Sequence, residues 1–405
     1  MSGAPSLSDY EALAPAGTLP LISHLAQELA GRSFLHVNAT RVGGGVAEIL
    51  HRLLPLLDEL GIRPRWEVIA GPAEFYACTK RIHNALQGAD LPLTAPMKEA
   101  YLEANRQALR SIDLSADLVL IHDPQPAALV EGRRSDAAWI WRCHIDLSRP
   151  LRAVWRFLEP FVSGYDAAVF HIAPFAPRLP IPCYLMYPSI DPLADKNRDL
   201  EEGEVESRVA ALGVPLDRPI LLQVSRYDAF KDPVGVIRAF RLVRRVRDCV
   251  LVLAGGAADD DPEGLQVLER VREEANDDPD IHVLLLPGDA HLDINALQRA
   301  ATVVIQKSIK EGFGLTVAEA MWKAKPVVGG AVGGITHQIQ DGVTGYLVHS
   351  VEGCAYALRR LLSDDDQRRA MGRLAREFAR RNLLITRHLA DYLQMLRLHT
   401  GEGRP

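Results

Sequence analysis

The sequence predicts an α/β protein built from two Rossmann-like domains, each a doubly wound parallel sheet, that face a cleft. Its 405 residues exceed the length of one ordinary domain. Short, continuous apolar runs alternate with amphipathic segments of helical period, a pattern typical of parallel strands covered on both faces. Hydrophobic residues make up 48% of the chain, which is enough for two cores.

The second half shows the alternation most regularly. We expect strands at 219–225, 249–256, 281–288, 302–308, 325–330 and 345–349. We expect helices at 232–246, 262–275, 293–300, 316–324, 334–340 and 351–363. In a sheet of this kind ligands bind at the carboxyl ends of the strands, so the candidate residues are sought there.

The first half repeats the theme less regularly. It opens with a strand at 33–39, followed by a glycine turn and a long helix. Strand-like runs follow at 65–70, 117–122, 137–144, 166–172 and 182–187. The chain is rich in proline and charge between about 174 and 220, so we place the linker near 188–200. The domains are then 1–190 and 191–384, with a C-terminal helix at 385–400 completing the first.

Charge, cysteines and hydropathy exclude several classes of protein. The net charge of −6 argues against a nucleic-acid partner. The five cysteines are widely spaced with no C-x-x-C, as expected for reduced thiols of a cytoplasmic protein. No apolar run approaches the length of a membrane span, and the N-terminus lacks the features of a signal peptide.

The stretch "KEGFGLTVAEA" carries the first candidate site. Gly312 and Gly314 allow a tight turn into a helix whose free N–H groups can bind an anion. Thr316 and Glu319 have the spacing of a capping box. Glu311 and Glu319 would flank such an anion, and carboxylates suit the hydroxyl groups of a sugar. The alternative is a strand–turn–helix in which Glu319 only caps.

Two cations follow the strand at 219–225. Arg226 and Lys231 lie in "SRYDAFKDP" and could clamp a diphosphate, the arginine as a fork and the lysine as a point charge. Turns also carry arginine and lysine that are merely solvated. Their place at a strand's carboxyl end, in the same domain as the glutamates, favours the clamp.

A glycine loop follows the first strand of the chain. The sequence "RVGGGVAEI" lacks the G-x-G-x-x-G spacing of a dinucleotide site and the G-K-[ST] of a P-loop. Gly43, Gly44 and Gly45 are therefore expected to let a ligand approach the start of a helix.

Together these motifs resemble those of the retaining glycosyltransferases of family 4, which have the glycosyltransferase B fold. Glu311 and Glu319 match the family's Glu-x7-Glu motif, and Arg226 and Lys231 match its basic pair. Gly43 to Gly45 match its N-domain loop, and "YPSID" resembles its inter-domain segment. A narrower resemblance, carried by "NATRVGGGVAEIL", "LVLIHDPQPAAL", "WIWRCHIDLSRP" and "VVIQKSIKEGFGLTVAEAMWKAKPVV", is to the trehalose glycosyl-transferring synthases and trehalose phosphorylases.

The resemblance implies a role for each candidate residue. Residues 191–384 would bind the nucleotide-sugar donor and residues 1–190 the acceptor. Glu319 would hold the ribose and Glu311 the transferred glucose. The donor site would also include Gly312, Phe313, Gly314, Leu315 and Thr316, whose neighbouring backbone N–H groups would face sugar and diphosphate. His144 matches a family histidine near the reaction centre, although a lone histidine at a strand end is often structural. The acceptor candidates, for which function and scaffold are equally open, are His122, Asp123, Gln125, Arg142 and Asp146.

The implied reaction is a retaining transfer of glucose from a nucleoside-diphosphate-glucose to free glucose, which forms α,α-trehalose reversibly. A glycosidase mechanism is disfavoured because Glu319 is expected in the first helical turn, where the helix dipole keeps a carboxylate ionised. Arg226 and Lys231 would supply positive charge, so we expect no essential metal. We also expect no tightly bound cofactor. The partners would be sugars and nucleotide sugars, UDP-, ADP- or GDP-glucose being equally open, with a homodimer as the expected assembly.

Four alternatives accompany this interpretation. A trehalose phosphorylase would use phosphate in place of the nucleotide, and another family 4 enzyme would use a different acceptor. An epimerase of the same fold would release a changed sugar without an acceptor. A catalytically silent nucleotide-sugar-binding protein would be expected to lack His144 or Glu311, and both are present.

Overall fold

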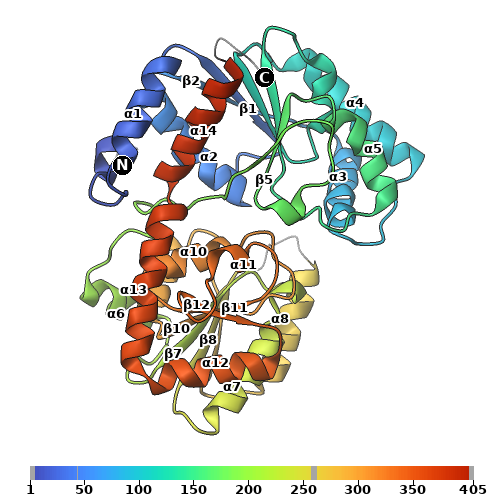
Figure 1. The fold of residues 1–405 in the computed structure, drawn as a ribbon. Coiled ribbons are helices and arrows are strands. Elements are labelled where there is room, and N and C mark those ends of the chain that lie inside the picture. Colours follow the sequence, from blue (N-terminus) through green and yellow to red (C-terminus); the bar gives the residue numbers. More distant parts are fainter. Residues whose placement is uncertain (1–4, 43, 257–261, 401–405) are drawn as a thin grey trace. The chain divides into compact units, whose positions relative to one another are not determined.

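The computed structural model describes residues 5–42, 44–256 and 262–400, which form two compact units (Figure 1). Unit 1 comprises Met1–Ser189 and Ile385–Pro405, and unit 2 comprises Ile190–Leu384. The two points where the chain passes between the units lie together in the fold, because Ile190 and Leu384 form an isolated parallel bridge.

Unit 1 contains a six-stranded parallel sheet with the strand order β2-β1-β3-β4-β5-β6. Its strands are β1 (Ser33–Asn38), β2 (Arg63–Val68), β3 (Leu118–His122), β4 (Ala138–Arg142), β5 (Ala167–Phe170) and β6 (Cys183–Leu185). The order reverses between β1 and β3, so the loops that follow these two strands flank the point where open α/β sheets bind ligands.

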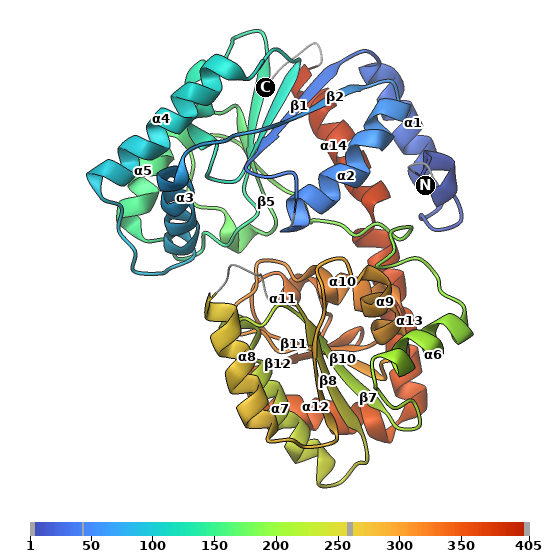
Figure 2. The same ribbon diagram turned by 180° about the vertical axis from the view of Figure 1, so that it is seen from behind.

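Helices cover both faces of this sheet (Figures 1 and 2). On one face lie α1 (Thr18–Leu29), α2 (Gly44–Glu59) and α14 (Ile385–Thr400), and α14 packs on both of the others. On the other lie α3 (Ala73–Leu86), α4 (Ala95–Ser111) and α5 (Arg152–Val162). The second face encloses a large apolar core that includes Trp139 and Trp141 of β4. Because side chains alternate along a strand, Arg142 points to the opposite face, toward α14.

Unit 2 contains a second six-stranded parallel sheet, with the order β12-β11-β10-β7-β8-β9. Its strands are β7 (Ile220–Val224), β8 (Val250–Gly255), β9 (Ile281–Leu285), β10 (Val303–Gln306), β11 (Val327–Gly330) and β12 (Gly345–Val348). This is the doubly wound order of dinucleotide-binding sheets, and it reverses between β7 and β10. The loops after β7 and β10 therefore flank the expected ligand position of this unit.

The helices of unit 2 complete the fold. They are α6 (Glu202–Ala211), α7 (Pro233–Arg244), α8 (Pro262–Ala275), α9 (His291–Ala300), α10 (Leu315–Trp322), α11 (Ile335–Gln338), α12 (Val351–Ser363) and α13 (Asp365–Asn382). α7 packs between α12 and α8, whereas α6 packs on α9 and α10 on α13. The predicted α/β class with two doubly wound parallel sheets is confirmed. Helices α1, α3, α4, α5 and α6 were not among the elements predicted from the sequence.

Candidate functional site

In unit 2 the basic loop after β7 and the glutamate loop after β10 lie side by side. The Nζ atom of Lys231 is 2.6 Å from Oε2 of Glu311, although the two residues are 80 positions apart in sequence. The N–H of Ile309 donates to the carbonyl of Phe230 at 2.8 Å. The parallel pairing of β10 with β7 brings these loops together, so the cation and the carboxylate that the sequence singled out are ion-pair partners.

A second ion pair fixes the base of the same loops. Lys307, directly after β10, pairs with Asp232 at the start of α7. The other carboxylate oxygen of Asp232 accepts from the N–H of Gly235 and caps that helix. Asp232 adopts a φ of 50°, which is uncommon for a residue other than glycine and is held here by both contacts.

Glu311 is oriented through one of its two carboxylate oxygens. Oε2 accepts from Lys231 and also from Ser308 Oγ at 3.2 Å and Gln306 Nε2 at 3.4 Å. Among the described residues, no donor reaches Oε1. The side chain is 9% exposed, so the protein fixes the carboxylate and leaves one acceptor for another molecule.

The predicted capping box at Thr316 and Glu319 is wrong. α10 begins at Leu315 with Gly314 as its N-cap, and Glu319 therefore lies in the second turn of the helix, not the first. The Thr316 hydroxyl donates to Gln306 Oε1 at 3.3 Å instead of capping. Gly314 takes the capping position because its φ of 86° is costly for any residue with a Cβ atom. Glu319 therefore lies outside the first helical turn, within which the helix dipole acts on a side chain.

Glu319 is buried and, like Glu311, is held through a single oxygen. It is 4% exposed, and Oε2 accepts from Gln298 Nε2 at 3.3 Å. Within the part of the chain that the structure describes, Oε1 has no hydrogen-bond partner. This oxygen can accept a hydrogen bond from a hydroxyl group of a ligand.

The turn between the two glutamates opens onto the start of α10. Because the N-cap Gly314 has no side chain, the first N–H groups of the helix receive no side-chain cap. The carbonyls of Phe313 and Gly314 accept from Gln338, and the carbonyl of Gly312 accepts from Gly334. The turn is thus anchored through its carbonyls. The N–H groups at the helix start can serve an anion.

Arg226 lies on the same side of the sheet but is open to solvent. Its side chain is 65% exposed and makes a long ion pair with Asp228, 3.7 Å from Nη2 to Oδ2. An exposed pair of this length holds the guanidinium weakly. Arg226 is therefore free to reorient onto a ligand, whereas Lys231 is already fixed.

In unit 1 the glycine loop follows β1. Gly44 begins α2 with a φ of 78°, and a Cβ atom built at this position would meet nothing within 4 Å. Gly45 lies in the first turn of the same helix. Gly43 lies outside the described residues. The space around Gly44 is compatible with the expected approach of a ligand.

Four histidines form a chain in unit 1, one within β1, one at the end of β3 and two just after β4 and β5. His36 Nδ1 lies 3.0 Å from His122 Nε2, and His122 Nδ1 lies 3.0 Å from His144 Nε2. His144 Nδ1 lies 3.3 Å from His171 Nε2. Both ring nitrogens of His144 thus face other histidines.

All four histidines of this chain are held in the neutral state. Burial, with a smaller effect of the Arg142 charge, lowers the pKa of His36 and that of His171 to about 3. Burial also lowers the pKa of His122 and His144 well below the ordinary value. Each neutral imidazole carries one proton, so every bond of the chain has one donor and one acceptor.

This arrangement predicts that unit 1 loses stability in mild acid. The folded state binds fewer protons than the unfolded state below pH 6.5, so stability falls as the pH drops toward the folded pKa. Each such histidine lowers the free energy of unfolding by about 1.4 kcal/mol for each pH unit of this fall. Thermal unfolding between pH 7 and pH 4.5 measures this slope. His36→Gln, which cannot titrate, should unfold with a shallower slope whatever its overall stability. An unchanged slope would contradict the neutral chain.

Arg142 is fully buried inside unit 1. Its Nη1 atom lies 2.8 Å from both the Tyr392 hydroxyl and the sulfur of Met186, and its guanidinium lies over the Tyr392 ring. Since Tyr392 belongs to α14, the residue ties β4 to the C-terminal helix. Arg142, like His122, is enclosed by unit 1 in this structure, and an acceptor role for either residue stays a prediction.

The other acceptor candidates are only partly buried. Asp123 has a φ of 67°, and its Oδ1 accepts from the N–H of His144 at 2.8 Å. Burial raises the pKa of Asp123 to about 7. Gln125 Oε1 is buried without a partner among the described residues. Asp146 Oδ1 accepts from the N–H of Ser148. Asp123 and Gln125 follow β3 and so lie at the point where the strand order reverses.

No group of three or more His, Cys, Asp or Glu side chains in residues 5–42, 44–256 and 262–400 could hold a metal ion. None of the helices in these ranges combines the length and the apolar character needed to cross a membrane.

Several residues that orient the glutamates were not found from the sequence. Gln306 and Ser308 contact Glu311, while Gln298 of α9 contacts Glu319. Ser308 precedes Glu311 by three positions and could have been noticed as a nearby donor. Gln298 lies 21 positions from Glu319 on another helix, and no local pattern indicates this contact.

Comparison with known proteins gives a consistent assignment. Residues 36–177 match the family model "Trehalose synthase, N-terminal domain", and residues 205–378 match "Glycosyl transferases group 1". A trehalose synthase from Pyrococcus horikoshii is 47% identical over 401 residues, which cover 98% of this chain and 97% of the relative. A trehalose phosphorylase from Pleurotus pulmonarius is 29% identical over 91% of this chain but only 58% of its own length.

A solved structure supports the fold. The UDP-forming α,α-trehalose-phosphate synthase from Burkholderia xenovorans superposes with a TM-score of 0.72 at 17% identity, covering 92% of this chain and all of that one. At this identity the likeness concerns the fold alone. The family models, the nearly full-length identity and the two sheets together establish that the chain belongs to the trehalose synthase family of glycosyltransferases, with the glycosyltransferase B fold.

Proposed function

We propose that this glycosyltransferase moves glucose from a nucleoside-diphosphate-glucose to free glucose, with retention of configuration, and so forms α,α-trehalose in a reversible reaction. The observation that carries the proposal is the matched state of Glu311 and Glu319. Each is fixed through Oε2 and has no partner for Oε1 among the described residues. Two such acceptors on either side of a helix N-terminus suit the two hydroxyl-bearing parts of a nucleotide sugar.

In this proposal Glu319 accepts from the ribose and Glu311 from the glucose that is transferred. The bond from the glucose anomeric carbon to the diphosphate breaks, and its electron pair leaves with the phosphate oxygen. The start of α10, Arg226 and Lys231 stabilise that charge. An ammonium group has three N–H donors, and Lys231 uses one on Glu311. The remaining donors can hold the phosphate, so Lys231 would connect leaving group and sugar.

The acceptor glucose attacks the same face that the diphosphate leaves, and its anomeric hydroxyl passes its proton to the departing phosphate oxygen. Retention follows from attack on this face. In unit 1, Asp123, Gln125 and Asp146 are the candidates for binding acceptor hydroxyls, and Gln125 has a vacant buried oxygen. His144 would join the site by exchanging a histidine partner for the sugar.

Product analysis tests the proposal. The purified protein is incubated with free glucose and with UDP-, ADP- or GDP-glucose, and the disaccharide is identified by proton NMR. We expect α,α-trehalose, whose two equivalent α-anomeric protons give one doublet, together with the nucleoside diphosphate. Trehalose and the nucleoside diphosphate should regenerate the nucleotide sugar. A lipid, polysaccharide or sugar-phosphate product would contradict the proposed acceptor.

The phosphorylase alternative is tested in the same experiment. Trehalose and inorganic phosphate, without nucleotide, should give no glucose 1-phosphate. Phosphate-dependent cleavage would replace the synthase assignment by a phosphorylase and would leave the fold unaffected. The vacant oxygen of Glu319 favours the synthase, because inorganic phosphate has no ribose to occupy it.

A further inference from the structure

A buried polar cluster lies beside Glu319, made of Asn197, Gln298, Glu319 and Lys323. Asn197 belongs to the segment that enters unit 2, Gln298 to α9, and the other two to α10 and its C-cap. All four are at most 6% exposed. Lys323 Nζ lies 2.7 Å from Gln298 Oε1, 3.0 Å from Asn197 Oδ1 and 3.3 Å from the carbonyl of Glu319. Gln298 Nε2 completes the cluster by donating to Glu319 Oε2.

The donor and acceptor groups of these side chains determine the direction of the hydrogen bonds in the cluster. An ammonium group can only donate hydrogen bonds, so protonated Lys323 requires the oxygen of the Gln298 amide to face it. The NH2 group of that amide must then point the other way, toward Glu319. A neutral amine has a lone pair and would also accept from a turned amide. The charge on Lys323 thus determines whether Gln298 presents a donor to the carboxylate.

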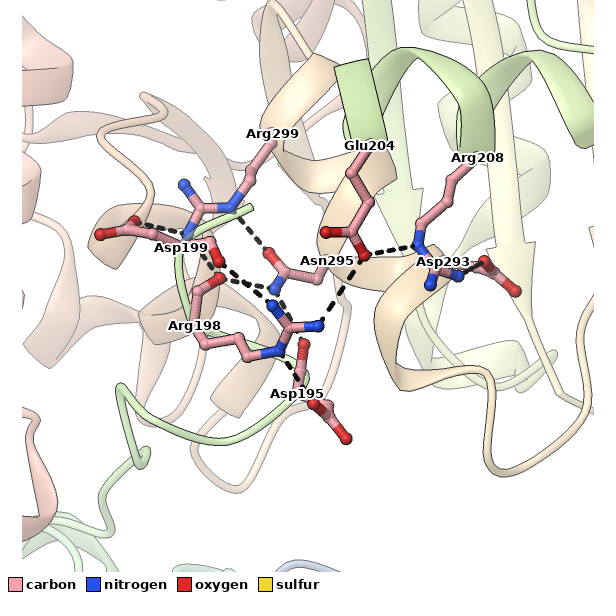
Figure 3. A network of polar contacts seen from close by, with 8 residues as sticks. All are labelled: Asp195, Arg198, Asp199, Glu204, Arg208, Asp293, Asn295 and Arg299. Carbon is pink, nitrogen blue, oxygen red and sulfur yellow. Dashed lines mark hydrogen bonds and ion pairs between the residues drawn. The ribbon is translucent and has the colours of Figure 1, made fainter. Parts of the chain in front are cut away.

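Asn197, which accepts a hydrogen bond from Lys323, lies in a segment that α9 holds in place. Arg299 donates to the carbonyl of Arg198 at 2.8 Å and to Asp199 Oδ1 at 2.9 Å (Figure 3). Asn295, fully buried on the same helix, donates to the carbonyls of Asp195 and Arg198. These contacts immobilise the segment at 195–199, and Lys323 bonds to a residue within it.

We propose that Lys323 and Gln298 are positioning residues, which hold the Glu319 carboxylate in the orientation that receives the ribose of the donor. The inference rests on the ribose role proposed for Glu319. Oε2 is engaged by Gln298, so the carboxylate cannot rotate freely and Oε1 stays available. Without the donor from Gln298, a buried carboxylate would seek another partner and would lose its preferred orientation.

The charge on Lys323 responds to pH near neutrality. Burial lowers the pKa of Lys323 to about 7, against the opposing effect of Glu319. The other charged groups around it are Arg299 and Lys196, which lower the pKa, and Asp199, which raises it. Lys323 loses its proton as the pH rises through this value, so the preference for ribose should weaken between pH 6 and pH 9.

Nucleotide binding measures this effect. Calorimetry gives the dissociation constants of UDP, ADP and GDP and of their 2′,3′-dideoxy counterparts, and the ratio within each pair is the ribose preference. We expect Lys323→Met and Gln298→Met each to reduce the preference by about tenfold, the scale of one hydrogen bond to a charged group. A loss of packing alone would weaken both members of a pair equally and leave the ratio unchanged.

Lys325→Met is the matched control. Burial lowers the pKa of this neighbouring lysine to about 8, yet among the described residues its side chain has no hydrogen bond to Gln298 or Glu319. This variant should keep the full ribose preference and its dependence on pH. Lys323→Met should lose the dependence on pH. The pH dependence of the ribose preference can also be measured on the wild-type protein. A preference that stays constant from pH 6 to pH 9 would overturn the proposed role of Lys323.

Glu319→Ala distinguishes the ribose role of Glu319 from the positioning role of Lys323 and Gln298. If it abolishes the ribose preference while Lys323→Met and Gln298→Met both retain it, the positioning inference is overturned and the donor assignment stands. If Glu319→Ala itself keeps the preference, the ribose role fails and the inference fails with it.

Discussion

Lys231→Ala is expected to lower kcat by about 100-fold or more, the scale of removing a preorganised charge stabiliser. The ammonium group is expected to stabilise the departing diphosphate, and it is also the ion-pair partner of Glu311. Arg226→Ala should cause a loss of similar scale, but with little effect on stability, because this side chain is 65% exposed and its ion pair is long. Initial rates at saturating donor and acceptor give kcat, and thermal unfolding reports the stability of each variant.

A double mutant separates the two roles of Lys231. If the lysine acts only by orienting Glu311, then Lys231→Met combined with Glu311→Gln will be no slower than Glu311→Gln alone. We expect the double mutant to be slower, because the phosphate also loses its cation. Arg245→Ala is the control for lost charge, since Arg245 is exposed at the C-terminal end of α7. Full activity of both Lys231→Ala and Arg226→Ala would show that the clamp is wrongly assigned.

The two glutamates should differ in which kinetic constant they control. Glu319→Ala is expected to raise the donor KM by about 10- to 100-fold with little change in kcat, because the ribose is remote from the bond that breaks. Glu311→Ala should lower kcat by about 100-fold with a smaller change in KM, because it holds the sugar whose charge changes in the transition state.

Steady-state kinetics with varied nucleotide sugar measure this split. Glu311→Gln is the companion variant, since it keeps the size of the side chain and removes the charge that pairs with Lys231. Wild-type kinetics for both alanine variants would mean that the glutamates have only a structural role. Equal effects of both on kcat would contradict the separation of ribose from glucose.

Particular elements show why the fold was predictable. The strands of unit 2 are predominantly apolar runs, and β7, β8 and β10 are buried at every position. Such runs are visible without knowledge of their neighbours. α4 was not indicated by the sequence, because its buried residues are only Tyr101, Ala104, Asn105 and Ala108. A buried face of mostly small and polar side chains gives a weak helical period.

The start of α10 was predicted wrongly for a local reason. Thr316 and Glu319 have capping-box spacing, but Gly314 adopts the left-handed conformation and takes the N-cap position, two residues before Thr316. The backbone conformation of this turn depends on the residues packed around it. A Cβ atom at this position would lie 3.3 Å from Cγ of Glu311, a contact that only the folded loop creates.

The sequence by itself determined the α/β class, the alternation of strands and helices, and the residue types at the strand ends, because these depend on local periodicity and spacing. Only the tertiary structure decided which of those residues meet. It paired Lys231 with Glu311, linked four histidines in or just after four strands, and placed Gln298 and Lys323 beside Glu319. The physical reason is the parallel sheet, which gathers the carboxyl ends of strands that are distant in sequence, and no local pattern encodes the partner that another loop provides.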